Sequence, residues 1–254
     1  MNVICFGQQP CGFLPKGFLI AKINTARKLQ KEIGGKIVFF YHDSDADYRE
    51  TITILRDLKT GDEVRLNFTQ ENKLQKKYSP LYLKRIPKGW EDEIVKQLPR
   101  FVDKALVEIF KSVNEKFVAD FCLQMYLKMD LLDGIKIVRS SDKNFRQKAI
   151  DISDGFADVE YRGEVVRAKI EPDRLSLHEG GGRYTYLHKP DKIEKSQISA
   201  AASKRLAWMQ SVINCIHYIY GEGEKEYLKF HDFPNLKFIE REKIDNPDFA
   251  WLPA

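Results

Sequence analysis

A dense group of side chains that can hold a proton or a cation follows the short apolar segment 37–41. The group consists of His42, Asp43, Asp45 and Asp47. Carboxylates crowded at one point bind a divalent cation or push their pKa values apart, which suits metal binding and general acid–base catalysis. Acidic residues at a strand end can also simply cap the next element, but the density of this group favours a functional role. We therefore predict His42, Asp45 and Asp47 as catalytic residues.

Polar residues also surround the glycine-rich segment 7–17, which precedes a predicted helix. A helix N-terminus offers free N–H groups to anions, and an ammonium group stabilises negative charge in a water-poor site. The segment matches neither the GxGxxG fingerprint nor a P-loop. Lys16 and Lys22 could each be solvated helix lysines, and a functional role is better supported for Lys22, which we predict as catalytic. The predicted ligand-binding residues here are Gly7, Gln8, Gln9, Gly12, Lys16 and Gly17.

A third candidate turn follows the apolar segment 216–220 and contains Gly221, Gly223 and Glu224. Glycines allow the backbone to approach a ligand closely, and Glu222 or Glu224 could contact a hydroxyl or amine group. Glycines also occupy strand-to-helix turns for geometry alone. His217, inside the apolar segment, is more simply a core histidine.

Two further groups are weaker candidates. Lys195 and Ser196, together with Lys204 and Arg205, could clamp a phosphate, or they could be the solvated start of a helix. Cys11 could be a nucleophile, but no histidine is fixed near it by the sequence.

These residues need a sheet that brings their strand ends together. Segments 2–6 and 37–41 are short, apolar and β-rich, and they flank a helical pattern from Leu19 to Ile33, which is typical of a βαβ unit. We predict one α/β domain, 1–254, with a mostly parallel sheet, helices on both faces, and irregular insertions near 51–90 and 151–195. The further predicted elements are an added hairpin at 51–68, two helices over 91–132 bent near Pro99, a strand at 135–138, a helix to Ile150, short hairpins and a flexible loop over 151–190, a helix at 199–213, a strand at 216–220, a helix at 225–231 and a strand at 236–239.

Composition sets broad limits. The chain has 254 residues, of which 43% are hydrophobic, and this is enough for a full core. A net charge of +5 is spread along the chain and does not by itself indicate nucleic acid. The four cysteines show no zinc-type spacing. No segment reaches the ~18 apolar residues of a membrane span. We therefore expect a cytoplasmic protein without a membrane partner, and the sequence gives no indication of the oligomeric state.

Parts of the chain resemble the bacillithiol-biosynthesis cysteine-adding ligase family. Gly7-Gln8-Gln9 with Lys22 resembles its opening motif, and Asp45-Ala46-Asp47 with Glu50 resembles its acidic motif. A late pattern matches at Tyr218, Gly221, Gly223, Glu224 and Tyr227. The resemblance implies a bacterial, ATP-dependent enzyme. The family's C-terminal coiled-coil part has no counterpart here.

A wider likeness concerns the tryptophan and tyrosine class of aminoacyl-tRNA synthetases. Segment 7–17 is similar to their HIGH-type turn, and 192–196 resembles their KMSKS loop, which implies the nucleotidylyltransferase-like Rossmann superfamily. The likeness adds Lys195 and Ser196 to the predicted nucleotide-binding residues. Three positions depart from the family patterns, because Pro15, Phe18 and Ala46 stand where histidines are expected.

The function that these observations favour is an ATP-dependent, ligase-like enzyme for a small amine or amino acid, with ATP or another adenine nucleotide, and Mg²⁺, as cofactors. One alternative is a binding module that has lost catalysis. A second is RNA binding through the basic stretch 73–85 with Tyr78 and Tyr82, although we do not expect nucleic acid as the partner. We predict that one pocket contains Gln9, Lys22, Asp45, Asp47 and Glu224, because each lies at or beside the carboxyl end of a predicted parallel strand.

Overall fold

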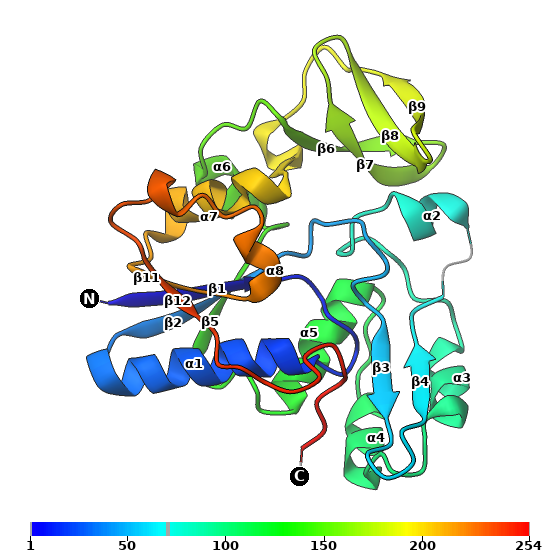
Figure 1. The fold of residues 1–254 in the computed structure, drawn as a ribbon. Helices are drawn as coiled ribbons and strands as arrows, with labels where there is room; N and C mark the ends of the chain where they lie inside the picture. The colour runs from blue at the N-terminus through cyan, green and yellow to red at the C-terminus, as the bar shows by residue number, and fades with distance from the viewer. Residues whose placement is uncertain (1, 70–71, 254) are drawn as a thin grey trace.

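The centre of the protein is a five-stranded parallel sheet, seen in a computed structural model that describes residues 2–69 and 72–253 (Figure 1). Its strands lie in the order β12-β11-β1-β2-β5. The chain moves outward from β1 through β2 to β5, and in the opposite direction from β11 to β12, so the topological switch point lies between β1 and β11. This confirms the predicted α/β class, and the order is consistent with a Rossmann-like fold. The strands are β1 (Val3–Gln8), β2 (Lys36–Tyr41), β5 (Ile135–Arg139), β11 (His217–Tyr220) and β12 (Lys237–Glu240).

Helices cover both faces of this sheet because successive strand residues point in opposite directions. Ile4 and Phe6 of β1 belong to a core shared with α1 (Gly17–Ile33) and α5 (Val118–Lys128). Val3 and Cys5 belong to a second core shared with α6 (Lys143–Lys148) and α7 (Arg205–Ile213). Burial on both faces explains why the strand sequences are almost continuously apolar.

The predicted hairpin forms, but it does not join the parallel sheet. β3 (Thr53–Arg56) and β4 (Glu63–Leu66) make a separate two-stranded antiparallel sheet. Leu55 and Leu66 of this hairpin share the first core with Trp90 and Phe110 of the neighbouring helices. The hairpin is therefore attached to the domain by side-chain packing and is not part of the parallel sheet.

The helical region after the hairpin contains three helices where two were predicted. They are α3 (Trp90–Gln97), α4 (Lys104–Lys111) and α5, and a short α2 (Lys73–Lys77) precedes them. Leu98 has an extended backbone with ψ of 129° because the following Pro99 disfavours the helical conformation. The proline therefore ends a helix here instead of bending one.

A second sheet occupies most of the region that we expected to be least regular. Five antiparallel strands lie in the order β10-β6-β7-β8-β9, above the parallel sheet in Figure 1. They are β6 (Gly155–Tyr161), β7 (Glu164–Ile170), β8 (Arg174–Gly180), β9 (Arg183–His188) and β10 (Ile198–Ala200). Because 198–200 is the edge strand of this sheet, helix α7 starts at Arg205 and not near Ser199 as predicted.

The last part of the chain returns to the start of helix α1. α8 (Glu222–Lys225) is a single turn that ends where the helix over 225–231 was predicted to begin. Beyond β12, the backbone N–H of Gly17 donates to Phe249 O at 2.9 Å, and the N–H of Phe18 donates to Pro247 O at 2.9 Å. The N–H of Trp251 donates to Pro15 O at 2.7 Å. The N-terminus of α1 is thus capped by the protein's own C-terminal segment.

Within the described ranges, no helix has the length and apolar character needed to cross a membrane.

Candidate functional site

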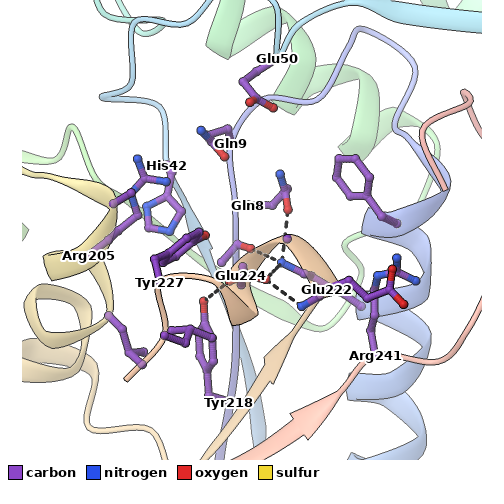
Figure 2. A pocket seen from close by; sticks show the side chains of 18 of the residues that line it. Gln8, Gln9, His42, Glu50, Arg205, Tyr218, Glu222, Glu224, Tyr227 and Arg241 are labelled. Atoms are coloured by element: carbon purple, nitrogen blue, oxygen red, sulfur yellow. Dashed lines mark hydrogen bonds and ion pairs between the residues drawn. The ribbon is translucent and has the colours of Figure 1, made fainter. Parts of the chain in front are cut away.

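A cavity of about 450 Å³ opens at the switch point, where the carboxyl ends of β1 and β11 meet (Figure 2). This is the position at which open α/β sheets bind ligands, and the volume falls in the usual range for small-molecule pockets. Its walls come from β1, α1, the segment after β2, α7, the turn around α8, and the C-terminal segment. The lining residues are Gly7, Gln8, Gln9, Phe18, Lys22, His42, Asp45, Glu50, Ala202, Arg205, Leu206, Met209, Tyr218, Gly221, Glu222, Gly223, Glu224, Tyr227, Leu228, Arg241, Pro247 and Asp248.

Gly7 allows two polar side chains from neighbouring strands to approach each other. A Cβ atom on residue 7 would lie 2.7 Å from His42 Nε2 and 3.1 Å from the hydroxyl of Tyr218. Such distances leave no room for a side chain. The glycine is therefore required by the packing of His42 and Tyr218 around it, and not by its backbone conformation.

Lys22 and Glu224 form an ion pair inside the cavity. The Lys22 ammonium group donates to Glu224 Oε2, to Gly7 O at 2.8 Å and to Gln8 Oε1 at 3.2 Å. Glu224 also accepts from Tyr218 Oη at 2.8 Å and from the Gly221 N–H at 2.9 Å. The side chains are 3% and 14% exposed, so the charge of this lysine is already neutralised by the protein. The pair fixes α1, β11 and α8 around the cavity.

Asp45 holds two other polar side chains that line the cavity, Gln9 and Arg205. Its Oδ2 accepts from Gln9 Nε2 at 3.0 Å and from Arg205 Nη2 at 2.8 Å, and Arg167 Nη1 lies 3.8 Å from Oδ1. Burial alone raises the pKa of Asp45, but Arg167 and Arg205 outweigh that effect and hold the pKa well below its usual range. Asp45 is therefore ionised, and it orients Gln9 and Arg205.

His42 is a buried histidine that lines the cavity. The side chain is 6% exposed, and Nδ1 has no hydrogen-bond partner among the residues that the structure describes. Burial lowers its pKa well below the ordinary value, and the charges of Arg205 and Lys22 lower the pKa further. The imidazole is therefore neutral and can accept a proton or a hydrogen bond from a ligand.

Glu50 has the opposite character. Burial raises its pKa, and Asp47 and Asp45 add to that rise while Lys16 counteracts it. Burial thus favours the neutral forms of both Glu50 and His42 and shifts both of their pKa values, and perturbed pKa values of this kind cluster at functional sites.

Some charged residues that line the cavity have no ion-pair partner among the described residues. Within the described ranges, Arg241 contacts only the backbone carbonyl of Glu242 and has no carboxylate partner. Glu222 and Asp248 are exposed and also make no ion pair there. One free cation and several carboxylates could receive a ligand that carries both an anionic group and an amine.

The structure brings most of the predicted residues together. Of the five predicted to share a pocket, Gln9, Lys22, Asp45 and Glu224 line the cavity. Asp47 does not, because it is directed to the surface, where it pairs with Arg49 Nη2 at 2.6 Å. Other predicted residues that line the cavity are Gly7, Gln8, His42, Gly221 and Gly223. Asp43 is fully buried and accepts hydrogen bonds from Arg139, Ser140 and Ser141, so it joins β2 to β5.

Gly12, Lys16 and Gly17 lie outside the cavity, contrary to their prediction as ligand-binding residues. Gly12 has φ of +103° and lies against Thr53, so its role is the turn. Lys16 is 8% exposed, and its backbone pairs with that of Ala250 in an isolated antiparallel β-bridge. A Cβ on Gly17 would lie 3.3 Å from Ile244 and 3.5 Å from Pro247 O. The C-terminal segment occupies the place where an anion was expected.

Lys195 and Ser196, which we predicted as nucleotide-binding residues, also lie outside the cavity. Lys195 Nζ pairs with Asp151 at 2.8 Å, and Ser196 O accepts from Arg146 Nη1 at 2.9 Å. Neither residue lines the cavity. Their short segment supports the second sheet instead.

In the basic stretch 73–85, Tyr78, Tyr82 and Lys84 are engaged inside the protein, whereas the side chains of Lys73 and Arg85 are exposed. Tyr78 is 5% exposed, and Tyr82 Oη donates to Asp158 at 2.8 Å. Lys84 is 1% exposed and donates to the carbonyls of Gln75 and Lys76. Cys11 is fully buried beside Tyr126, and burial raises its pKa, which makes it a poor nucleophile.

Several cavity residues were missed by the sequence-based list. Arg241 directly follows β12 and would have been found by the same strand-end rule that found Glu224. Glu50 stands three residues after Asp47. Phe18, Met209 and Leu228 carry no chemical signal in the sequence, and only the fold places them here.

No group of three or more His, Cys, Asp or Glu side chains within residues 2–69 and 72–253 is arranged to hold a metal ion. A magnesium ion bound with a nucleotide needs only one or two carboxylates, because phosphates and water complete its shell.

In comparisons with known protein families and with curated proteins, no family model matches this chain and no curated relative is similar to it.

Proposed function

We propose that the protein is a nucleotide-dependent, ligase-like enzyme of nucleotidylyltransferase type that acts on a small amine or amino acid in this cavity. The observation that supports it most is the convergence of Gln9, Lys22, Asp45 and Glu224 with His42 at the switch point of the parallel sheet. These residues come from four separate parts of the chain. Sheets of this kind bind nucleotides and other small ligands at that edge.

Different side chains of the cavity would bind the phosphates, bind the amine and accept its proton. Lys22 and Arg205, the other two cations that line the cavity, pair with Glu224 and Asp45, whereas Arg241 has no carboxylate partner among the described residues. Arg241 is therefore the residue that would contact the phosphates. A bound nucleotide would supply the activated phosphoryl or adenylyl group. Glu50, Glu222 and Asp248 attract an ammonium group, and neutral His42 accepts the proton that this group must lose before its nitrogen can attack.

The binding test is a titration with ATP and Mg²⁺ followed by calorimetry. We expect saturable binding, which weakens about tenfold to a hundredfold in Arg241→Ala because a hydrogen bond to a charged group is lost. Arg183→Ala changes an exposed arginine of β9 and serves as the matched control. If the Arg241→Ala variant binds ATP with unchanged affinity, the phosphates do not contact Arg241 and the proposed position of the nucleotide is wrong.

The turnover test follows ADP or AMP release with pooled amino acids and simple amines. Release that depends on the amine supports a ligase, and the variant His42→Gln should abolish most of it. Removing a general base typically costs 10²–10⁴-fold in rate.

A second candidate is a binding module without catalysis. One observation favours it: the N–H groups of Gly17 and Phe18 are bonded to the carbonyls of Phe249 and Pro247, so the helix N-terminus is not free to bind an anion. Binding of ATP or adenosine without amine-dependent turnover would select this candidate.

A further inference from the structure

The hairpin formed by β8 and β9 carries aromatic and basic side chains on one face. Figure 1 shows both strands at the top of the molecule, away from the parallel sheet, and β9 is an edge strand of the second sheet. Residues that pair directly across antiparallel strands lie on the same face. No acidic residue is among the six on this side, which we call the hairpin face. They are Arg174 paired with His188, Ser176 paired with Tyr186, and His178 paired with Tyr184.

The opposite side of the hairpin is turned to the interior. Leu175 and Leu177 of β8 and Leu187 of β9 belong to the core of the second sheet. On the hairpin face, by contrast, only the small Ser176 is buried, and the other five side chains are exposed. The alternation of the two strands therefore directs the aromatic and basic side chains to the solvent.

The two tyrosines of the hairpin face form an ordered row with their neighbours. Tyr184 and Tyr186 are 48% and 54% exposed, their ring centroids are 6.3 Å apart, and their planes differ by only 14°. The ring of His178 lies 5.1 Å from that of Tyr184, and Arg174 Cζ lies 4.0 Å from the centre of the Tyr186 ring. Exposed aromatic groups that lie together, with arginine beside them, are typical of interaction surfaces.

Two cations near these rings are available to an anionic partner. Arg174 pairs with Glu171 through Nε only, at 2.7 Å, and its two Nη atoms have no hydrogen bond to the described residues. This pair is exposed and therefore contributes little. Lys189, next to His188, donates to the backbone carbonyls of Glu171 and Pro172 at 3.0 Å and has no carboxylate partner in the described ranges.

We propose that the hairpin face, together with Lys189, is a binding site for single-stranded nucleic acid. Two bases stack on the rings of Tyr184 and Tyr186, while Arg174 and Lys189 contact the phosphates. Exposed aromatic side chains on antiparallel sheets bind single strands in this way, and nearby cations hold the backbone. A duplex is a poorer ligand because its bases are already stacked on one another.

Nucleic acid fits this surface better than an acidic protein segment does. Carboxylates of a peptide would neutralise the two cations, but they offer no planar groups to the row of exposed rings. A single strand supplies both phosphates and planar bases. None of these residues lines the switch-point cavity, so the site is separate from the one proposed for ATP and does not depend on it.

Fluorescence anisotropy with a labelled octauridylate tests the proposal, and octathymidylate is the DNA arm. We expect saturable binding with a Kd of ~10–100 μM at 50 mM salt. Two phosphate contacts imply about a sevenfold loss of affinity at 200 mM salt, because each contact releases counterions from the strand. The oligonucleotide that binds more tightly identifies the site as one for RNA or for DNA. An eight-base-pair duplex should bind more weakly than either strand, despite its higher charge.

Variants of the tyrosines test whether the bases stack there. The double variant Tyr184→Ser/Tyr186→Ser should weaken binding by about fivefold to 150-fold or more, since stacking on one aromatic ring has an effect of this size. Tyr184→Phe/Tyr186→Phe keeps both rings and should retain binding. Phe101→Ser changes another exposed aromatic residue, outside the hairpin, and serves as the matched control. All these positions are exposed, and an unchanged thermal unfolding midpoint will confirm that each variant is folded.

A charge variant tests the phosphate contacts separately. Arg174→Gln should reduce the slope of log affinity against log salt by about 0.7, which corresponds to one phosphate contact. Lys31→Gln removes an exposed cation of α1 and should leave that slope unchanged.

Four results would overturn the proposal. They are no binding of either oligonucleotide, equal binding by the double serine variant, equal affinity for the duplex, and tighter binding of an octaglutamate peptide. The last result would assign the hairpin face to an acidic protein partner.

Discussion

The ammonium group of Lys22, on the first helix, is bonded to the carboxylate of Glu224, which lies 202 residues further along the chain. Breaking a buried pair by removing one partner leaves an uncompensated charge. We therefore expect Lys22→Met to lower the free energy of unfolding by about 3 kcal/mol, as measured by urea denaturation.

Lys28→Met is the control for that prediction. Lys28 pairs with Glu242, but its side chain is 69% exposed, and exposed pairs contribute about 1 kcal/mol or less. The double variant Lys22→Met/Glu224→Gln should be more stable than the sum of the two single changes implies. Equal losses for the Lys22 and Lys28 variants would show that the buried pair does not fix the cavity.

Gly7→Ala tests the close packing beneath the cavity. The new Cβ would stand 2.7 Å from His42 Nε2 and must displace that ring. We expect a loss of about 1–3 kcal/mol in stability, together with loss of ligand binding. Gly223→Ala is the matched control, because this glycine lines the same cavity and an added Cβ would meet nothing within 4 Å. If both variants bind ligand equally well, His42 does not need its observed position.

Part of the fold and of the candidate site could be predicted from the sequence, and part could not. The β1–α1–β2 unit was predicted because its apolar pattern is local, and the strand-end rule then gathered Gln9, Lys22, Asp45 and Glu224. Asp43 and Asp47 looked equivalent to Asp45, yet their roles are decided by Ser140 and by Arg49. Over 151–190 the sequence predicted short hairpins and a flexible loop, but not the sheet that these strands form together, because strands such as β9 are largely exposed. The N-terminus of α1 is capped by backbone hydrogen bonds to Pro247 and Phe249. Backbone hydrogen bonds do not depend on side-chain type, so the sequence pattern could not predict this cap.

The lowered pKa of His42 predicts a dependence of stability on pH. In the unfolded chain the imidazole titrates near 6.5, whereas burial, Arg205 and Lys22 lower its pKa in the folded protein. Between these two values the unfolded state binds more protons, so stability is full above pH 6.5 and is lost as pH falls toward the folded pKa.

His42→Gln removes this titration. Comparing unfolding free energies of the two proteins from pH 7.5 downward should reveal a difference with a slope of up to ~1.4 kcal/mol per pH unit. Parallel curves for the two proteins would mean that His42 is not held neutral by its surroundings.

Glu50→Gln should separate stability from activity. Burial raises the pKa of Glu50, so the fold disfavours its charged form. Above the ordinary pKa, the Glu50 carboxyl group ionises more readily in the unfolded chain than in the folded protein, and this difference destabilises the fold. The neutral amide of glutamine does not ionise and so removes that destabilisation. We expect the variant to gain up to about 1 kcal/mol at pH 7.5, as stabilising changes at functional sites often do, while amine-dependent turnover falls. A less stable variant with full turnover would contradict both parts.

The central claim, that the switch-point cavity is the nucleotide site, is tested most directly by a crystal structure with ATP and Mg²⁺ bound. The account predicts density for the nucleotide inside the cavity, with its phosphates on Arg241 and with His42 and Glu50 lining the remaining space. A nucleotide bound elsewhere, or one whose phosphates displace Phe249 and Pro247 from the N-terminus of α1, would contradict it.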